Sequence, residues 1–289
     1  MEPGGTVEGP GSTSAPTGGQ VPSGAVGGPE GNGALPLQPA AVPAADVVPV
    51  ATPGRDEESA TAPPPKLENV LVFSRTAGFR HEAIGAGIES IRTLGAANGF
   101  AVAQTEDAAQ FTDARLAGFD VVIWLSTSAD VLDDTQQGAF ERYIQGGGGW
   151  VGVHAASDTE YAWAWYGQLL GGAAYFKNHP AIQVATIHVE QAGHPSTAHL
   201  AASFQLQDEL YNFYANPRSS VTVLMTLDES SYQPGEGAMG ADHPIAWYHE
   251  FDGGRAWYTA LGHRPQLYAD PRFTQHLLGG IRWAAGVAP

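Results

Sequence analysis

Short apolar runs alternate with helix-length amphipathic segments over most of the chain, and this alternation constrains the fold more than any other feature. The run 120–125 (Asp-Val-Val-Ile-Trp-Leu) has no polar position after Asp120, which is typical of a strand buried on both faces. The run 69–73 precedes it, and between the two, residues 82–98 carry apolar side chains at helical spacing. Strand–helix–strand units of this kind predict a doubly wound, mostly parallel α/β sheet with helices on both faces.

The second half of the chain has many strand-like runs and few helical ones, so we expect an antiparallel β region added to the parallel sheet. A helix beginning at Asp133 or Asp134 and ending near Ile144 comes before this region. The remaining expected elements are strands at 100–103, 150–153, 181–189, 204–209, 221–227, 245–251 and 255–261, and a closing helix over 271–285.

Residues 1–66 differ from the rest in composition, with twelve Gly, thirteen Pro and no aromatic residue. Such a segment cannot bury enough apolar surface to offset the entropy of ordering it, so we predict a disordered Pro/Gly-rich tail or linker. The folded domain is expected over 67–289. The first residues have neither a basic segment nor an apolar core, so no signal peptide is predicted in this chain. An extracytoplasmic location would need a start further upstream, and the compartment stays open.

The charge and the cysteine count exclude several functions. Thirteen Lys and Arg stand against thirty Asp and Glu, a net charge of −17, which argues against a nucleic-acid partner. No run is long and apolar enough for a transmembrane helix. With no cysteine in the chain, thiolate metal sites and cysteine nucleophiles are excluded.

Three histidines directly follow predicted strands, at the edge where ligands bind in such sheets: His81, His154 and His263. Gly152-Val-His154 has the spacing of a nucleophile elbow with an imidazole in place of the nucleophile. For His154 alone, the alternative is a buried ring bonded to a backbone carbonyl. Glu209 lies at a strand end, where it could orient a histidine or accept a proton, or else cap a turn. Several strand-end histidines together favour a functional site.

A dense aromatic loop follows the elbow and includes Tyr161, Trp163, Trp165 and Tyr166. Aromatic faces of this kind stack on sugar rings, and they also pack in protein cores. We expect two of the four to be packing residues.

The sequence from Leu67 to about Gly286 resembles the ThuA-like (trehalose utilisation) family. No single motif is decisive, but the order of the motifs and the share of the chain that they cover are specific. The segments that carry the resemblance are 78–81, 140–143, 146–156, 165–167, 176–180, 208–211, 242–247, 254–255, 259–263 and 279–283. The resemblance implies a flavodoxin-like fold of the class I glutamine amidotransferase type. It places His154 where amidotransferases have their cysteine and His263 near their catalytic histidine. Pro265 replaces the triad acid, so glutamine hydrolysis is not expected.

The resemblance further implies a role in the breakdown of trehalose or a related disaccharide, with 3-keto sugars as intermediates. We hypothesise that His154, His263, Glu209 and His81 are catalytic, through acid–base chemistry or a metal-polarised carbonyl. The enzyme would then be an isomerase, hydrolase or lyase of a small-molecule sugar or keto-sugar. His81, His154 and His263 are the candidate ligands of Zn²⁺ or another divalent metal. The side chains that we assign to substrate binding are Tyr161, Trp163, Trp165, His179, Tyr211 and His243.

Two alternatives stay open. The first is a non-catalytic carbohydrate-binding or accessory module tethered by the tail, in which the aromatic residues matter and the histidines are structural. The second is a hydrolase with Ser157 as nucleophile, for which the sequence places no base. The oligomeric state is not predicted.

Overall fold

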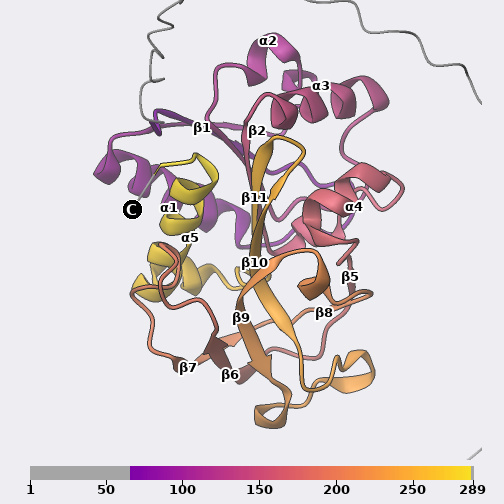
Figure 1. Ribbon diagram of the computed structural model, residues 1–289, viewed down its shortest axis with the longest axis vertical. Coiled ribbons are helices and arrows are strands. Elements are labelled where there is room, and N and C mark those ends of the chain that lie inside the picture. Colours follow the sequence, from indigo (N-terminus) through magenta and orange to yellow (C-terminus); the bar gives the residue numbers. More distant parts are fainter. Residues whose placement is uncertain (1–65, 288–289) are drawn as a thin grey trace, which may run out of the picture. The chain divides into compact units, whose positions relative to one another are not determined.

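The computed structural model describes residues 66–287, so all of the predicted tail except Lys66 lies outside the described residues. A mixed sheet of nine strands runs through this part of the chain in the order β2-β1-β3-β4-β11-β10-β9-β6-β7 (Figure 1). Five strands pair in parallel: β2 (Ala101–Thr105), β1 (Asn69–Phe73), β3 (Val121–Leu125), β4 (Gly149–Val153) and β11 (Gly254–Thr259). The predicted doubly wound sheet is confirmed.

The predicted antiparallel region is confirmed as well, and it extends the sheet from β11. Its strands are β10 (Pro244–Phe251), β9 (Thr222–Asp228), β6 (Gln183–Val189) and β7 (Ser203–Asp208). A separate antiparallel pair joins β5 (Phe176–Asn178) to β8 (Asn212–Phe213). This small sheet was not predicted, because a two- or three-residue strand leaves too short a pattern to detect.

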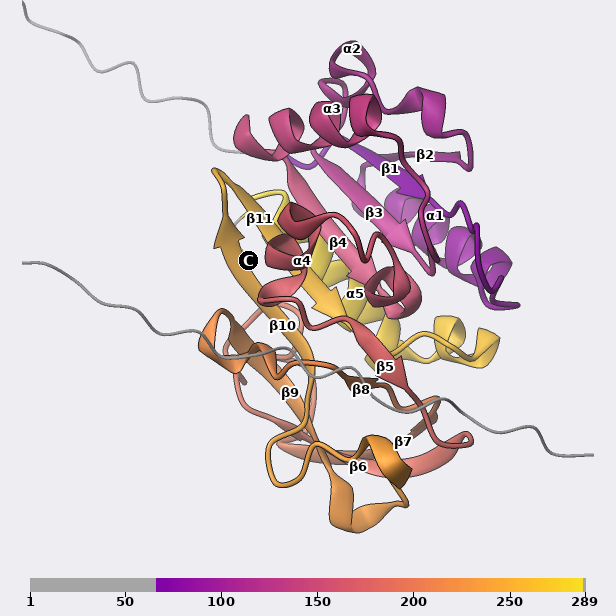
Figure 2. The ribbon, with the colours of Figure 1, turned by 90° about the vertical axis from the view of Figure 1, so that its right-hand side faces the viewer.

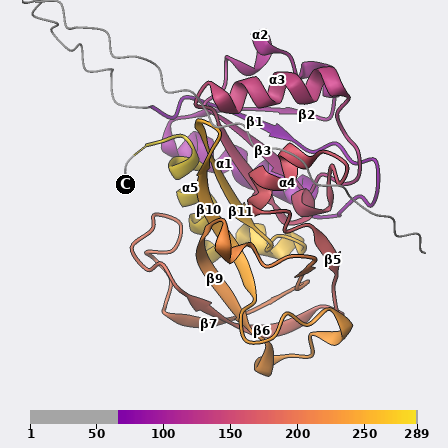
Figure 3. The ribbon, with the colours of Figure 1, turned by 45° about the vertical axis from the view of Figure 1, so that its right-hand side comes forward.

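Helices cover both faces of the sheet. Figures 2 and 3 show α1 (Ile84–Asn98) and α5 (Pro271–Ala284) together on one face, with α3 (Asp134–Gln145) and α4 (Ala164–Gly171) on the other. The short α2 (Asp113–Leu116) packs beside α3. Capping fixes where several of these helices begin: Asp133 forms a capping box with Gln136 at the start of α3. Asp270 caps α5, with Pro271 in its first turn.

The second half of the aromatic segment after the elbow is helical, which corrects the loop that we expected there. Trp165 and Tyr166 belong to α4, and Tyr166 is fully buried against Trp124 of β3 with ring centroids 4.8 Å apart. The core therefore holds an aromatic layer between the sheet and this helix. Within residues 66–287, no helix combines the length and the apolar character that crossing a membrane requires.

Candidate active site

Three histidines and one glutamate converge at the carboxyl ends of the parallel strands. His154 directly follows β4, His81 lies between β1 and α1, and His263 lies four residues beyond β11. Glu209 follows β7 and enters from the antiparallel region. One ligand atom from each of the four lies within 4.8 Å of the others, and the three imidazole centroids are 4.7–5.3 Å apart. We call these four residues the histidine cluster.

The backbone at the end of β4 has the predicted elbow geometry. His154 has a φ of 52°, in the left-handed region that few side chains adopt. Gly152 allows the strand to pack closely, because a Cβ there would overlap the Trp150 ring and crowd Tyr258. His154 Nδ1 lies 2.7 Å from the Ala260 carbonyl oxygen, to which it donates. The backbone hydrogen bond anticipated for a buried histidine is therefore present, and it leaves Nε2 to carry the lone pair.

Glu209 connects the histidines of the cluster. Its Oε2 lies 3.3 Å from His154 Nε2 and 3.0 Å from His263 Nδ1. Its Oε1 lies 3.1 Å from Nδ1 of His179, which follows β5. The Glu209 side chain is only 8% exposed, so these contacts are poorly screened by solvent.

The surroundings set the charge of each member. Burial, reinforced by the imidazoles of His154 and His263, lowers the pKa of His81 to about 3, so this ring is neutral near pH 7. Burial acts to raise the pKa of Glu209, but its contacts with His154 and His263 outweigh burial and hold that pKa well below the usual range. The carboxylate in turn raises the pKa of His263. The cluster thus combines a neutral imidazole with an ionised carboxylate.

Asp208 holds the segment that carries His263. Its buried carboxylate accepts hydrogen bonds from the backbone N–H groups of Gly262, at 2.8 Å, and Arg264, at 3.2 Å. Gly262 has a φ of 125°, a conformation that glycine adopts without strain. This positioning role of Asp208 is not visible in the sequence, because its partners are backbone groups more than 50 residues away.

Tyr211 and His179 lie beside the cluster. Tyr211 is buried with its ring 4.2 Å from that of His154, and its hydroxyl is 3.5 Å from His81 Nε2. His179 stacks against Phe176 and Tyr211, and 42% of its side chain is exposed. His179 is therefore the most accessible imidazole that contacts Glu209.

The other predicted binding residues lie further out or serve the framework. His243 is buried, with Nδ1 2.8 Å from Glu229 Oε1 and Nε2 2.8 Å from the carbonyl oxygen of Tyr211, so it supports Tyr211 from behind. Tyr161 is 43% exposed and donates to Asp158 and to the Phe176 carbonyl.

Trp163 and Trp165 stack on each other away from the cluster. Their indole nitrogens donate to Glu141 on α3 and to Asp252 in the turn between β10 and β11, at 2.9 Å each. Among the described residues, neither indole stacks on an imidazole of the cluster. Ser157 is buried, donates to the His154 carbonyl and accepts from the Tyr258 hydroxyl.

The donor set fits a divalent metal ion. His81 Nδ1, His154 Nε2 and His263 Nδ1 are buried, and none makes a hydrogen bond of good geometry within residues 66–287. The last two lie near Glu209 Oε2 but outside hydrogen-bond geometry, and buried ring nitrogens without a hydrogen bond are costly unless a ligand satisfies them. Ligand atoms on one tetrahedral zinc ion are about 3.3 Å apart, so atoms at the 4.8 Å limit of this set would move together by roughly 1.5 Å on binding. Imidazole and carboxylate together suit Zn²⁺ and its first-row neighbours.

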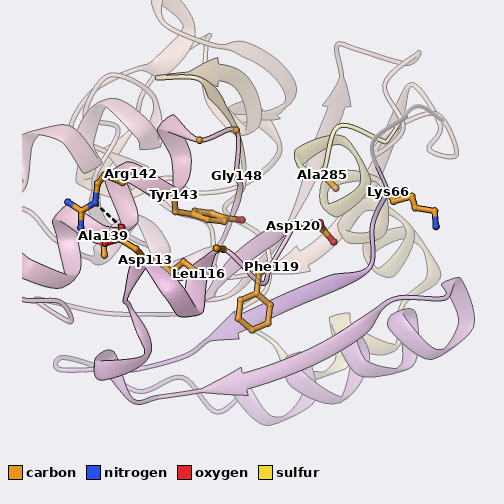
Figure 4. A pocket seen from close by; sticks show the side chains of 13 residues that line it. Lys66, Asp113, Leu116, Phe119, Asp120, Ala139, Arg142, Tyr143, Gly148 and Ala285 are labelled. Atoms are coloured by element: carbon orange, nitrogen blue, oxygen red, sulfur yellow. Dashed lines mark hydrogen bonds and ion pairs between the residues drawn. The ribbon is translucent and has the colours of Figure 1, made fainter. Parts of the chain in front are cut away.

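A cavity of about 380 Å³ opens beside the cluster, with His263 in its wall. The other residues that line it are Phe79, Glu82, Ile182, Arg264, Pro265 and Gln266. Phe79 and Arg264 were missed as candidates, although each is adjacent in sequence, or nearly so, to a predicted histidine. A second cavity, of about 550 Å³, lies at the opposite edge of the parallel strands, where Arg142 pairs with Asp113 (Figure 4). None of the predicted site residues lines that second cavity.

Comparison with known proteins identifies one family over nearly the whole described part of the chain. The family model for ThuA, described as trehalose utilisation, matches residues 69–284. A thua-like protein from Bacteroides uniformis shares 26% identity over 80% of this chain and 95% of its own, with a TM-score of 0.65. A thua-like protein from Parabacteroides merdae shares 19% identity, covering 76% and 90% of the two chains, with a TM-score of 0.62. None of the curated proteins matches the chain.

One further solved structure shows the fold alone. A β-galactosidase from Bacillus circulans sp. alkalophilus has 14% identity and a TM-score of 0.51, over 78% of this chain but only 32% of the galactosidase chain.

Proposed function

The chain belongs to the ThuA family of trehalose utilisation, and from this premise and the histidine cluster we propose that it is a metal-assisted enzyme acting on a keto-sugar. The reaction that we propose is proton removal from the carbon next to the sugar carbonyl, leading to elimination or isomerisation. The observation that carries the proposal is the convergence of His81, His154 and His263 on Glu209, with three buried nitrogens lacking hydrogen bonds.

The four cluster residues would hold the ion, and His154 is the best oriented of them. The Ala260 carbonyl fixes its ring and tautomer, as outer-shell partners of metal-binding histidines commonly do. His81 is neutral near pH 7, so one of its two ring nitrogens carries a free lone pair that can bind an ion. A bound divalent ion would polarise the substrate carbonyl and make the neighbouring C–H group more acidic.

His179 is the group best placed to take that proton. Its Nδ1 lies 2.9 Å from the Pro180 carbonyl oxygen and 3.1 Å from Glu209 Oε1, so a proton on Nδ1 has two acceptors. The lone pair is then on Nε2, in a ring that solvent and substrate can reach. The C–H bond breaks as Nε2 gains the proton, and the electron pair moves onto the carbonyl oxygen.

The proton then returns from His179 in one of two ways. In elimination, the C–O bond at the next carbon breaks and the departing oxygen takes the proton. In isomerisation, the former carbonyl carbon takes it, while the hydroxyl on the deprotonated carbon passes its proton to the former carbonyl oxygen and becomes the new carbonyl. Both outcomes share the first step, the removal of the proton next to the carbonyl, and it is this step that we propose.

The direct test is the metal content of untagged protein, measured by inductively coupled plasma mass spectrometry. We expect about one equivalent of a first-row transition metal in the wild type and little in His154→Asn. Asparagine suits this site because it tolerates the left-handed backbone. The matched control is His188→Asn, which removes an exposed histidine on β6 and should retain the metal.

The chemistry is tested with 3-keto-trehalose in deuterated water. Wild-type protein should exchange the hydrogen next to the carbonyl, which proton NMR detects, whereas His179→Gln should retain metal but exchange much more slowly. Absence of metal from all preparations, including protein reconstituted with divalent ions, would refute the metal centre. Retention of disaccharide binding in that case would favour the carbohydrate-binding alternative.

A further inference from the structure

We infer that the cavity beside His263 holds the second sugar ring of a disaccharide whose reacting ring lies at the histidine cluster. This inference rests on the proposed function for the position of the reacting ring. It adds a subsite, and Phe79 as the residue that selects disaccharides over monosaccharides. The cavity of about 380 Å³ has His263 of the cluster in its wall, so a ligand that fills it lies beside the cluster.

Phe79 presents an exposed aromatic ring from a loop whose backbone is fixed by hydrogen bonds. Its side chain is 66% exposed, and its ring meets the His81 ring edge-on, with centroids 4.8 Å apart. Ser128 fixes the loop, because its hydroxyl donates to the Phe79 carbonyl at 2.7 Å while its carbonyl accepts from Ala77 N–H at 2.9 Å. The Phe79 ring therefore offers a flat apolar face to solvent beside the cluster, on which a sugar ring can stack.

The rest of the lining matches the chemistry of a pyranose. Ile182, 43% exposed, adds a second apolar contact, and Glu82 and Gln266 offer hydrogen-bonding groups. The Arg264 guanidinium bonds to Gln207, and within residues 66–287 no carboxylate lies within ion-pair distance of it. A sugar ring presents C–H groups on its faces and hydroxyls at its edge, and therefore suits a pocket with flat apolar walls and a few polar groups.

The size of the cavity agrees with one sugar ring. At about 380 Å³ it lies near the lower end of ligand pockets, which are roughly 300–1,000 Å³. His263 belongs both to this lining and to the cluster, so the glycosidic oxygen of a disaccharide would pass beside its ring. A monosaccharide bound at the cluster would leave the Phe79 ring uncovered.

The test compares binding of trehalose and glucose by saturation-transfer NMR and titration, neither sugar being a keto-sugar that the enzyme could turn over. Wild type should prefer trehalose. Phe79→Ala should weaken trehalose binding about tenfold, with glucose binding and metal content unchanged. Phe79→Trp should restore the preference because it keeps a flat face. The matched control pair is Ile182→Ala, expected to weaken trehalose binding, and Val184→Ala, an exposed apolar change two residues away that should not.

The results that would overturn the subsite differ from those that would overturn the proposed function. Equal affinity of wild type for the two sugars, no binding of trehalose, or unchanged trehalose binding in Phe79→Ala would each overturn it. If Phe79→Ala lost both its metal and its trehalose binding, the role of Phe79 would be to hold His81 in place. That result would also overturn the subsite. Absence of metal from every preparation, together with a preference for trehalose that depends on Phe79, would refute the metal-assisted reaction. The subsite would still stand.

Discussion

Metal binding at the histidine cluster should raise the melting temperature, and the cluster geometry shows which variant removes the effect. Residues 66–287 form the folded unit, and for a domain of 150–250 residues each 1 kcal/mol of stabilisation raises Tm by about 2–4 °C. An ion at 100 times its Kd stabilises the native state by about 2.7 kcal/mol. The expected increase is therefore roughly 5–11 °C for chelator-treated protein titrated with Zn²⁺ or Mn²⁺.

His154→Asn should abolish this increase. The variant also loses the hydrogen bond to the Ala260 carbonyl, leaving a buried acceptor unsatisfied at a cost of about 1–3 kcal/mol, so its metal-free Tm should be lower. The informative quantity is thus the metal-induced change in each protein, measured by differential scanning calorimetry, and not the Tm itself.

The unfolded chain also binds metal through its histidines, of which the sequence has ten, and this reduces the increase. His188→Asn removes one histidine from the unfolded chain just as His154→Asn does, but leaves the cluster intact, so its increase should equal that of wild type. An increase of the same size in His154→Asn and wild type, or no increase with any first-row divalent ion, would refute the reasoning.

Three further predictions concern residues around the cluster and in the core. Asp208→Asn should weaken metal affinity about 10–100-fold, because the segment that carries His263 loses a charged acceptor for two backbone N–H groups. Competition with a chelating dye measures the affinity, and an unchanged value would deny Asp208 a positioning role. Glu160→Gln should lower the free energy of unfolding by about 1–3 kcal/mol in urea without altering metal affinity, since Glu160 accepts from the backbone of Val131 and Leu132 and from Gln137; a loss of metal binding would place it in the site. Burial lowers the pKa of His276 to about 3, below its unfolded value of about 6.5. The unfolded state therefore binds the extra proton, and the free energy of unfolding should fall as the pH drops from 6.5, by roughly 2–3 kcal/mol between pH 6.5 and 4.5. Urea unfolding of His276→Asn should show a correspondingly flatter pH profile.

The sequence was sufficient to predict the strands and helices that bury a periodic apolar face. Residues 121–125 form β3, and the closing helix begins at Pro271 as expected. The sequence was not sufficient for α4, because its apolar residues face both the sheet and their aromatic neighbours, so no single apolar face stands out. Burial of Tyr166 against Trp124 decides that the segment is helical, and this contact joins residues more than 40 positions apart.

The members of the site could be predicted where the backbone rule is general. The rule that ligands bind at the carboxyl ends of parallel strands selected His81, His154 and His263 out of ten histidines, and the structure brings these three together. The same rule does not extend to Trp163 and Trp165, which are close to the elbow in sequence but lie at the start of a helix beyond it, Trp163 as the residue before α4 and Trp165 within it. Proximity in sequence was a weak guide there, because the chain turns away after the short helical segment His154–Asp158.

The two halves of the sheet contribute different parts of the site. The parallel half supplies the three imidazoles, and its pairing of β4 with β11 brings the carbonyl of Ala260 to His154. The antiparallel half supplies the carboxylate, since Glu209 follows β7 directly. An elbow with a left-handed residue after a strand places that residue's side chain at the carboxyl edge of the sheet whatever its chemistry, and here the side chain is a buried imidazole oriented by a neighbouring strand. The antiparallel extension then completes a buried donor set for a cation, because without Glu209 the cluster would hold three imidazoles and no negative charge.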